Sequence, residues 1–432
     1  MAPWSDYAIF WHVYPLGFTG APAAAGPGEP VVHRLRRLTG WLDYAVELGC
    51  SGLLLGPVFA SGTHGYDTTD HFRVDPRLGD DADFDELVAA ARSRGLRIVL
   101  DGVFNHVGRS FPRFAEGPSA GWFRPRTGDD GTVTYATFEG HEQLVALNHD
   151  SPEVAAYVGD VMRHWLDRGA SGWRLDAAYH VPPRFWRSVL PGVRAAHPDA
   201  WFLGEMIHGD YAAYAQAGGL DAITAYELWK AIWSSLNDGN LFELAWALKR
   251  HDATLDGTMP QTFVGNHDVT RLASRLSDPR DLGAALAVLF TVGGVPSVYY
   301  GDEQAFRGVK EDRPGGDDAI RPEFPDAPDG LAPDGWPVYR LHQRLIGFRR
   351  RHPWLVRART EAVHLTNRAA ALCATSAEAD TRVFTLLNLG DEAYRFPIEV
   401  HEPTLADSGA PVDDPLVVAA HSWSILTVKD PS

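Results

Sequence analysis

The stretch Gly172-Trp173-Arg174-Leu175-Asp176 is a short apolar run that carries an arginine and an aspartate, two residues apart, at its end. In a β-strand, residues two apart point to the same side, so these two charged groups are expected to share one face. A buried charge is costly unless it has a partner. Taken alone, the pentapeptide is better explained by a structural ion pair, and other parts of the chain must decide.

Three more apolar runs also end in acidic groups. They are Arg97-Ile98-Val99-Leu100-Asp101, Trp201-Phe202-Leu203-Gly204-Glu205 and Thr262-Phe263-Val264-Gly265-Asn266-His267-Asp268. If all four runs are strands, polar groups stand at the carboxyl end of each one. This pattern is typical of a parallel barrel, whose active site lies at the carboxyl ends of its strands. We therefore expect an α/β protein with a (β/α)8 TIM barrel.

The composition predicts a large protein with a substantial core. The chain has 432 residues, 45% of them hydrophobic, which is enough for one large domain and one small one. Its net charge of −17 comes with no basic cluster, so neither nucleic acid nor an anionic membrane is an expected partner. Cys50 and Cys373 form no disulfide framework. We see no signal peptide and no membrane-spanning run, and we expect a cytoplasmic protein.

Predicted strands and helices alternate over the first 352 residues, with one interruption. The interval between Asp176 and Glu205 fits one βα unit of ~30 residues, whereas that between Asp101 and Asp176 is far too long. The excess is residues 107–148, a stretch rich in Gly, Pro and aromatic residues, which predicts a short excursion domain after the third strand. The helices are expected at 31–48, 83–94 (opened by Asp83), 152–168, 182–196, 281–291 and 337–351.

The pattern of hydrophobic and polar residues changes after Pro353. Short alternating runs such as Val383–Asn388 predict a small antiparallel β-sandwich. The expected organisation is a barrel formed by residues 1–106 and 149–352, an excursion domain at 107–148 and a C-terminal sandwich at 353–432.

Three of the acidic side chains, Asp176, Glu205 and Asp268, suit the cleavage of a glycosidic bond. An oxocarbenium-like transition state needs a nucleophile on one face and a proton donor on the other, and neighbouring strands bring two carboxylates close enough for the retaining mechanism. Arg174 would keep Asp176 ionised, and nearby anions would raise the pKa of Glu205 so that it stays protonated. Asp268 would bind ring hydroxyls and distort the sugar.

Two other interpretations of these residues stand beside this one. Acidic residues outnumber basic ones, so the three carboxylates are also explained as ordinary surface groups. His64, His106 and His267 suggest a zinc site, but they lack a tight ligand spacing such as H-E-x-x-H.

Six motifs between Gly65 and Glu303 resemble the conserved regions of the α-amylase family of retaining glycoside hydrolases. Four main regions are matched by Asp101–His106, Gly172–His180, Phe202–Met206 and Val264–Asp268, and accessory regions by Gly65–Asp70 and Gly294–Glu303, while the C-terminal sandwich is also similar to the family.

The resemblance implies a role for each of several residues. Three would carry out the reaction: Asp176 as nucleophile, Glu205 as acid/base and Asp268 as transition-state stabiliser. Four would contact the nucleophile or the sugar in the first subsite: Arg174, His106, His267 and Tyr66, whose ring would stack on the sugar. Asp101 would be structural.

The resemblance also bears on metal binding. Many family members hold a calcium ion between the excursion domain and the barrel, and Asn105 and the carbonyl of His180 match that site. Ala146 stands where calcium-binding members have aspartate. We therefore expect no required cofactor and no metal, with a structural calcium at Asn105 and His180 as the alternative.

The short excursion domain and the Ala146 motif are most similar to the cyclomaltodextrinase, neopullulanase and maltogenic amylase branch. Those proteins usually begin with a sugar-binding domain, whereas this chain starts almost at the first strand, so a monomer or a differently built homodimer is expected. Tyr179 stands where many relatives have lysine, which implies different subsites beyond the cleavage point.

The expected function is hydrolysis of α-1,4 bonds, and also of α-1,6 bonds, in short or cyclic maltooligosaccharides through a covalent glycosyl-enzyme. Transglycosylation, with phosphorolysis as a variant, or an α-glucosidase on the same scaffold are alternatives. Thr63 replaces an aspartate of many α-glucosidases, which argues against the last of these. A non-catalytic sugar-binding protein is the remaining alternative, and the presence of all three acids argues against it.

Overall fold

The computed structural model describes residues 3–24, 26, 28, 30–117, 121–128, 130–313, 315–377 and 379–429. Parts of all three predicted domains lie outside the described residues. These are positions 1, 2, 25, 27, 29 and 314 of the expected barrel, positions 118–120 and 129 of the expected excursion domain, and positions 378 and 430–432 of the expected sandwich.

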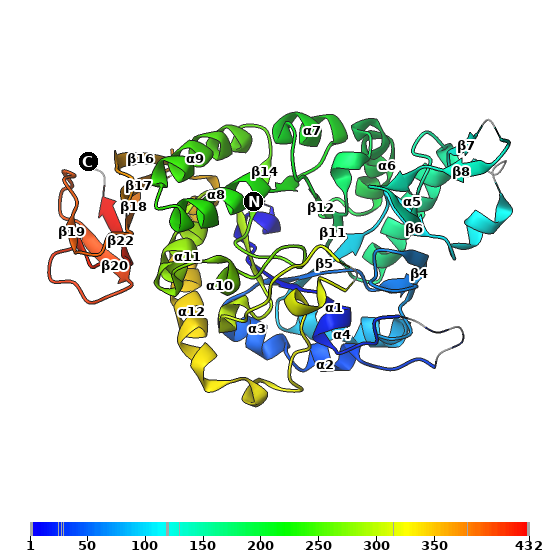
Figure 1. Cartoon of the computed structure of the whole chain (residues 1–432), viewed down its shortest axis with the longest axis horizontal. Helices are drawn as coiled ribbons and strands as arrows, with labels where there is room; N and C mark the ends of the chain where they lie inside the picture. The colour runs from blue at the N-terminus through cyan, green and yellow to red at the C-terminus, as the bar shows by residue number, and fades with distance from the viewer. Residues whose placement is uncertain are drawn as a thin grey trace.

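Within the described residues, eight strands close into a parallel barrel at the centre of the molecule (Figure 1) in the order β1-β15-β14-β13-β12-β11-β5-β2. The expected (β/α)8 barrel is confirmed. The strands are β1 (Phe10–Val13), β2 (Gly52–Leu55), β5 (Arg97–Gly102), β11 (Gly172–Leu175), β12 (Trp201–Gly204), β13 (Ala222–Thr224), β14 (Met259–Thr262) and β15 (Val295–Tyr299).

Large side chains fill one end of the barrel interior. Phe10 is fully buried and stacks on Trp201, with ring centroids 5.4 Å apart. Gly52, paired with Phe10 across β1 and β2, makes room for this ring, because a Cβ there would lie 2.8 Å from it. The interior is therefore a packed core, as in other barrels of this type, and it supports the polar groups at the opposite end of the strands.

The helices surround the barrel. They are α1 (Pro15–Phe18), α2 (Leu35–Thr39), α3 (Leu42–Leu48), α4 (Asp81–Ser93), α5 (Pro152–Asp167), α6 (Pro183–Ala196), α7 (Tyr211–Gly218), α8 (Tyr226–Asn237), α9 (Leu241–Leu255), α10 (Leu272–Arg275), α11 (Leu282–Thr291) and α12 (Trp336–Arg351).

Two helix predictions were wrong in detail. The single helix expected over 31–48 is two helices, α2 and α3, with a break at Gly40 and Trp41. Helix α4 is capped by Asp80 and not by Asp83. The Asp80 carboxylate accepts hydrogen bonds from the amides of Ala82 and Asp83. The Asp83 carboxylate accepts one from the amide of Asp80, which completes a capping box.

Two small sheets follow β5. Strands β6 (His106–Gly108), β10 (His141–Ala146) and β9 (Thr137–Phe138) form one, and β7 (Pro125–Thr127) and β8 (Val133–Tyr135) form the other. A further hairpin, β3 (Phe59–Ser61) and β4 (Thr68–Val74), follows β2.

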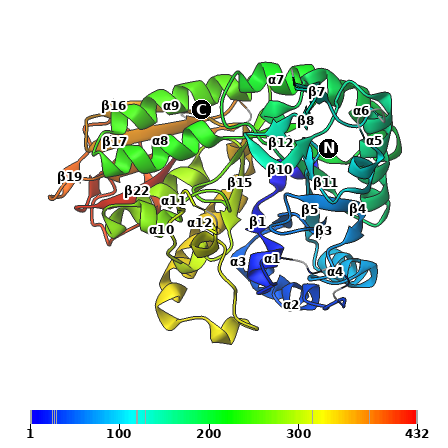
Figure 2. The same cartoon turned by 45° about the vertical axis from the view of Figure 1, so that its right-hand side comes forward.

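The C-terminal part of the chain forms the expected antiparallel sheet. Its order is β16-β17-β18-β22-β20, and β19 pairs with β21 beside it. This sheet and the β7–β8 hairpin lie at opposite ends of the molecule (Figures 1 and 2). The domain boundaries stay predictions. The strands are β16 (Arg359–Leu365), β17 (Ala369–Thr375), β18 (Thr381–Asn388), β19 (Tyr394–Arg395), β20 (Thr404–Ser408), β21 (Val417–Val418) and β22 (Ser422–Lys429).

Cys50 and Cys373 are both buried. In the part of the chain that the structure describes, no helix is at once long enough and apolar enough to cross a bilayer.

Candidate active site

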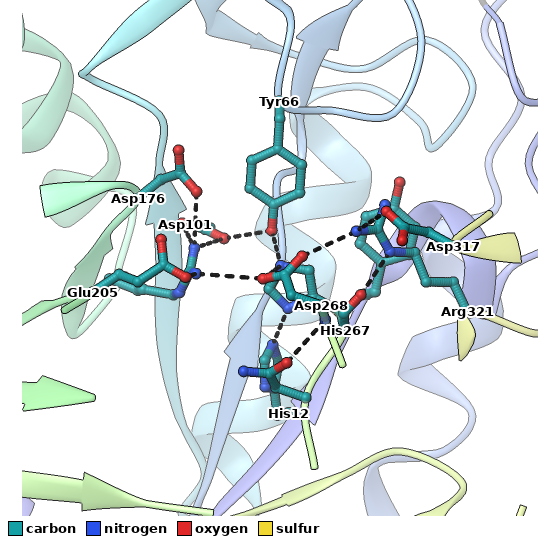
Figure 3. Close-up of polar contacts among 12 residues, drawn as sticks. His12, Tyr66, Asp101, Asp176, Glu205, His267, Asp268, Asp317 and Arg321 are labelled. Atoms are coloured by element: carbon teal, nitrogen blue, oxygen red, sulfur yellow. Dashed lines mark hydrogen bonds and ion pairs between the residues drawn. The ribbon is translucent and has the colours of Figure 1, made fainter. Parts of the chain in front are cut away.

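The predicted polar strand ends come together at the carboxyl ends of the barrel strands (Figure 3). Leu175 of β11 pairs with Gly204 of β12, so Asp176 and Glu205, the next residues, stand at the same level on neighbouring strands. Asp268 reaches the same place differently. Strand β14 ends at Thr262, and Asp268 lies in the following loop instead of at a strand end as expected.

Arg174 is the centre of this cluster. It is paired in register with Asp101 of β5, and its Nη1 lies 2.8 and 2.7 Å from the two Asp101 oxygens. The same nitrogen lies 3.3 Å from Asp176 Oδ1, and Nη2 lies 2.5 Å from Glu205 Oε1 and 3.9 Å from Asp268 Oδ2. One buried guanidinium therefore contacts four carboxylates, and Asp101 belongs to the cluster as a partner of Arg174.

The pKa values of the two central carboxyls are both raised. Burial, followed by the charge of Glu205, raises the pKa of Asp176 well above its usual range, and Arg174 opposes this. Burial is also the main cause that raises the pKa of Glu205, with Asp268 adding to it. Arg174 acts on Asp176 in the predicted direction, because its charge lowers the pKa of that carboxyl, but burial and Glu205 act more strongly the other way.

Two carboxyl groups held this closely in a buried site do not easily ionise together, so they titrate as a pair. Such a pair retains one proton where isolated carboxyls would both have lost theirs. This leaves one carboxylate and one carboxylic acid, which is the combination that a nucleophile and a proton donor require.

Glu205 has further partners that fix its orientation. Its Oε2 accepts a hydrogen bond from the amide of Ala177 at 2.8 Å, and Tyr226 Oη donates to Oε1 at 3.3 Å. Asn266 donates in turn to Tyr226 Oη at 2.8 Å. Sequence reasoning missed Tyr226, the first residue of α8, because no pattern distinguishes it from a buried core tyrosine.

Asp268 is the most open of the three predicted catalytic acids, with a side chain that is 30% exposed. Arg321, which the sequence analysis missed, lies 3.1 Å from its Oδ1 and 2.9 Å from Asp317 Oδ2 (Figure 3). Arg321 also donates from Nε to the carbonyl of His267 at 2.9 Å and lies over the ring of Tyr14. It comes from the long loop after β15, where no motif marks it.

Tyr66 and His267 lie side by side with their ring planes 2° apart. Tyr66 Oη donates to Asp101 Oδ2 at 3.0 Å and also contacts His267 Nε2. His267 Nδ1 lies 3.2 Å from His12 Nε2, and burial lowers the pKa of both histidines, to about 3 for His12. A neutral histidine can offer a hydrogen bond to a sugar hydroxyl without adding charge.

His106 lies in β6 and its ring stacks on Phe138, with centroids 4.6 Å apart. Burial lowers its pKa to about 3. Asn105 Nδ2 lies 3.0 Å from His106 Nδ1, and His180 Nε2 lies 3.4 Å from Glu139 Oε1. The calcium site of the resemblance does not fit these residues well, since Ala146 supplies no side-chain oxygen and calcium needs six or more oxygen ligands.

Six of the seven predicted site residues are joined by contacts in the structure, and the seventh, His106, lies in β6. Asp176, Glu205, Asp268, Arg174, Tyr66 and His267 are joined by contacts through Arg174 and Asp101, whereas His106 is connected to β6 and the excursion segment. His64, the third histidine of the zinc alternative, contacts the Tyr66 amide at 3.2 Å and shares no ion cluster with His106 and His267 among the described residues.

Comparison with known proteins shows the family to which this chain belongs. A family model described as the alpha amylase catalytic domain matches residues 34–372. A cyclomaltodextrinase from Bacillus sp. is 31% identical over 338 residues, which make up 71% of this chain and 60% of that protein. Neopullulanase 2 from Thermoactinomyces vulgaris is 29% identical over 440 residues, covering 92% of this chain and 72% of that protein.

A solved structure matches over nearly the whole chain. The ligand-free cyclic α-maltosyl-(1→6)-maltose hydrolase from Arthrobacter globiformis has a TM-score of 0.81 and 27% sequence identity, and the match covers 99% of this chain and 100% of that one. The chain thus spans 60% of the length of the Bacillus cyclomaltodextrinase and the full length of the Arthrobacter structure.

A parallel barrel with acidic side chains gathered at the carboxyl ends of its strands defines a class of protein, the barrel glycoside hydrolases. Within this class the chain belongs to the alpha-amylase family, since the family model covers most of it. The resemblance found in the motifs is confirmed, and the relatives include a cyclomaltodextrinase and a neopullulanase, the branch that the motifs predicted.

Proposed function

We propose that this protein is a retaining α-glucan hydrolase that acts on short or cyclic maltooligosaccharides. It cleaves α-1,4 bonds, and α-1,6 bonds where the substrate presents them. Asp176 is the nucleophile, Glu205 the acid/base and Asp268 the transition-state stabiliser. One observation carries the proposal: a single guanidinium, that of Arg174, contacts both Asp176 and Glu205. Because both carboxyl groups contact the same guanidinium, they lie close together, which supports the retaining mechanism, in which the two carboxyl groups are ~5–5.5 Å apart.

The reaction proceeds in two displacements. Asp176 attacks the anomeric carbon while Glu205 gives its proton to the departing glycosidic oxygen, which leaves a covalent glycosyl-enzyme. Glu205, now ionised, takes a proton from a water molecule, and the oxygen of that water displaces Asp176 from the sugar. Two contacts support the role of Glu205: the amide of Ala177 and the hydroxyl of Tyr226 hold its carboxyl group in place through both steps.

The substrate class is inferred from the relatives. The names cyclomaltodextrinase, neopullulanase and cyclic α-maltosyl-(1→6)-maltose hydrolase all describe enzymes acting on small or unusual α-glucans. The neutral ring pair of Tyr66 and His267 supports binding of an uncharged sugar beside the carboxylates, because an aromatic face packs against the apolar face of a pyranose.

The test is a product profile on maltotriose, cyclodextrins, cyclic maltosyl-maltose, pullulan and starch. The unmodified protein should release an α-anomer first, seen by proton NMR, and Asp176→Asn and Glu205→Gln should each lose at least ~10³-fold in kcat. Asp334→Asn, in an exposed position of the short 3-10 helix Pro333–Gly335, is the matched control and should keep full activity. A β-anomeric first product, or equal rates in Asp176→Asn and the unmodified protein, would contradict the proposal. Longer products at high substrate concentration would reveal transglycosylation.

Three further properties belong to this proposal. We infer that the reaction does not depend on calcium, which Ala146 supports, so activity should survive the calcium-selective chelator EGTA. We also propose that the protein acts in the cytoplasm, in line with the name of the intracellular maltogenic amylase of Bacillus subtilis, 30% identical over 337 residues. Cell fractionation tests this location. Analytical ultracentrifugation decides between the predicted monomer and homodimer.

A further inference from the structure

A cluster of ionisable side chains lies where the C-terminal sheet meets the barrel, away from the active site. Asp278 precedes and Asp281 ends a short 3-10 turn that leads into α11, and His421 stands in the turn just before β22. Their ligand atoms lie within 4.8 Å of one another. The cluster thus joins two parts of the chain that are far apart in sequence.

Two atoms of this cluster are buried and have no hydrogen-bond partner. The side chains of His421 and Asp281 are 10% and 7% exposed, and neither His421 Nδ1 nor Asp281 Oδ1 makes a hydrogen bond of normal geometry within the described ranges, although the two atoms face each other as an ion pair at 3.4 Å. A buried polar atom without a partner costs free energy comparable to the loss of a hydrogen bond, so such an atom needs an explanation. An ion bound between the two atoms supplies one.

The distances within the cluster match the edges of a tetrahedral site. His421 Nδ1 lies 3.4 Å from Asp281 Oδ1 and 3.5 Å from Asp278 Oδ2. Zinc binds histidine nitrogen at about 2.0–2.1 Å and carboxylate oxygen at about 2.0–2.2 Å, and two ligands at these lengths in a tetrahedron stand roughly 3.3–3.5 Å apart. The two measured separations therefore leave the right space for one ion between the histidine and the two carboxylates.

The other nitrogen of His421 is held as a ligating histidine requires. His421 Nε2 lies 3.0 Å from Asp391 Oδ1. In metal sites the histidine usually donates its second ring N–H to a carboxylate, which leaves the first nitrogen unprotonated and aimed at the metal. This contact selects Nδ1, the same atom that faces Asp278 and Asp281, as the ligating atom.

The cluster also has a route to solvent. A cavity of about 300 Å³ lies beside it, lined by Pro279, Arg280, Leu341, Gly409, His421 and Trp423 among others. Arg280 contacts Asp278 Oδ2 at 2.6 Å, but its side chain is 59% exposed and can turn outward. The cavity leaves room for a water molecule as a fourth ligand.

We propose that Asp278, Asp281 and His421 form a site for a divalent transition-metal ion, for which Zn²⁺ is the probe, and that the ion fastens the C-terminal sheet to the barrel. The mixed nitrogen and oxygen ligands favour zinc over calcium, which takes six to eight oxygen atoms. The proposal is independent of the proposed function, because none of the three residues lies in the active-site cluster.

The full-length protein, free of any histidine tag, is stripped with EDTA, given Zn²⁺ and passed over a desalting column. About one zinc ion per chain should be retained, and zinc should raise the thermal midpoint, because an ion that binds only the folded state stabilises it. Calcium at the same concentration should not. Both effects should disappear in His421→Gln and in Asp281→Asn, and Asp391→Asn should weaken zinc binding by about 10–100-fold.

The matched control is His33→Gln in a second group of potential ligands, His33, Asp80 and Asp83, where His33 is already engaged with Asp83 at 2.5 Å. This variant should keep both the retained zinc and the stabilisation. The readout is the change caused by zinc and not the midpoint itself, so a variant that is less stable for other reasons stays informative. The proposal is overturned if the unmodified protein retains no zinc, or if His421→Gln responds to zinc as the unmodified protein does. In that case His421 is a protonated imidazolium that forms ion pairs with Asp278 and Asp281.

Discussion

At the scale of single residues, the active site is a cluster with an excess of negative charge. Arg174 faces Asp101, Asp176, Glu205 and Asp268, and burial raises the pKa of the first three of these carboxyls. An oxocarbenium-like transition state carries positive charge, which fixed negative groups in a site shielded from water stabilise. Each arginine beside these carboxylates is therefore important for catalysis, because its positive charge affects how many of the carboxylates are ionised.

Arg321 is the second positive partner, and its removal should impair catalysis. Arg321→Ala leaves Asp268 without its 3.1 Å contact and frees the carbonyl of His267. Losing one partner of a largely buried charge pair costs about 2–5 kcal/mol, so kcat/KM should fall by 10-fold or more with Arg321→Lys in between. Asp317→Asn is the control, since it removes the other carboxylate on Arg321 together with a longer contact to Lys310, leaves Asp268 paired, and should change kcat/KM by less than about threefold. Steady-state kinetics on maltotriose checks this, and an unimpaired Arg321→Ala would refute it.

Glu303, fully buried after β15, should give the protein a measurable pH dependence of stability. Burial raises its pKa from 4.5 to about 7. A carboxyl with a raised folded-state pKa stabilises the fold below the unfolded value, here pH 4.5, and this contribution is lost as the pH rises through about 7. Glu303→Gln keeps an uncharged group beside the Tyr44 hydroxyl, so relative to the unmodified protein it should gain stability, on the order of 1–3 kcal/mol, between pH 5 and pH 8.

Thermal midpoints of the two proteins at pH 5 and pH 8 measure this effect, because the difference between them cancels all other titrating groups. A gap between the proteins that is the same at both pH values would show that Glu303 does not titrate in this range.

At the scale of helices and strands, most of the barrel could be predicted from the sequence. Short buried runs such as Gly172–Leu175 are typical of the strands of a parallel sheet, and the polar residue that follows each run marks its end. Asp268 was harder, because the apolar residues after Thr262 continue into a loop. Arg321 could not be predicted, since its position depends on the path of a long loop and not on any local periodicity.

The start of α4 shows what the sequence leaves open at an element's end. Asp80, Asp81 and Asp83 all lie where a cap could be, and only the backbone geometry selects Asp80. Asp80→Ala should destabilise the protein by about 1 kcal/mol, because two first-turn amides lose their acceptor. Glu86→Ala, on the exposed side of the same helix, should change the thermal midpoint by much less. Equal effects of the two substitutions would contradict the assignment of the cap.

At the scale of the whole molecule, the C-terminal sheet is held to the barrel through α11. Trp423 of β22 lies between two glycines, Gly283 of α11 and Gly409, and a Cβ on either would come within 2.4 and 2.8 Å of its indole nitrogen. A hydrogen bond of 2.8 Å between Thr385 Oγ1 and Thr291 Oγ1 crosses the same boundary. The packing of Trp423 depends on the close approach of the two glycines. The sequence alone does not predict this contact, because a glycine within a helix has no pattern that identifies its neighbour.

This close approach reverses the usual effect of replacing glycine in a helix. Alanine is favoured over glycine inside a helix by about 0.8–1 kcal/mol, so Gly192→Ala in α6, where the new methyl group meets nothing nearer than 3.8 Å, should raise the thermal midpoint slightly. Gly283→Ala adds the same methyl group against Trp423 and should lower the midpoint, since overpacking costs about 1–3 kcal/mol. Differential scanning calorimetry of both variants measures the two signs. If Gly283→Ala is as stable as Gly192→Ala, Trp423 does not pack against Gly283 of α11 as closely as described. The barrel and the C-terminal sheet should then unfold in separate transitions.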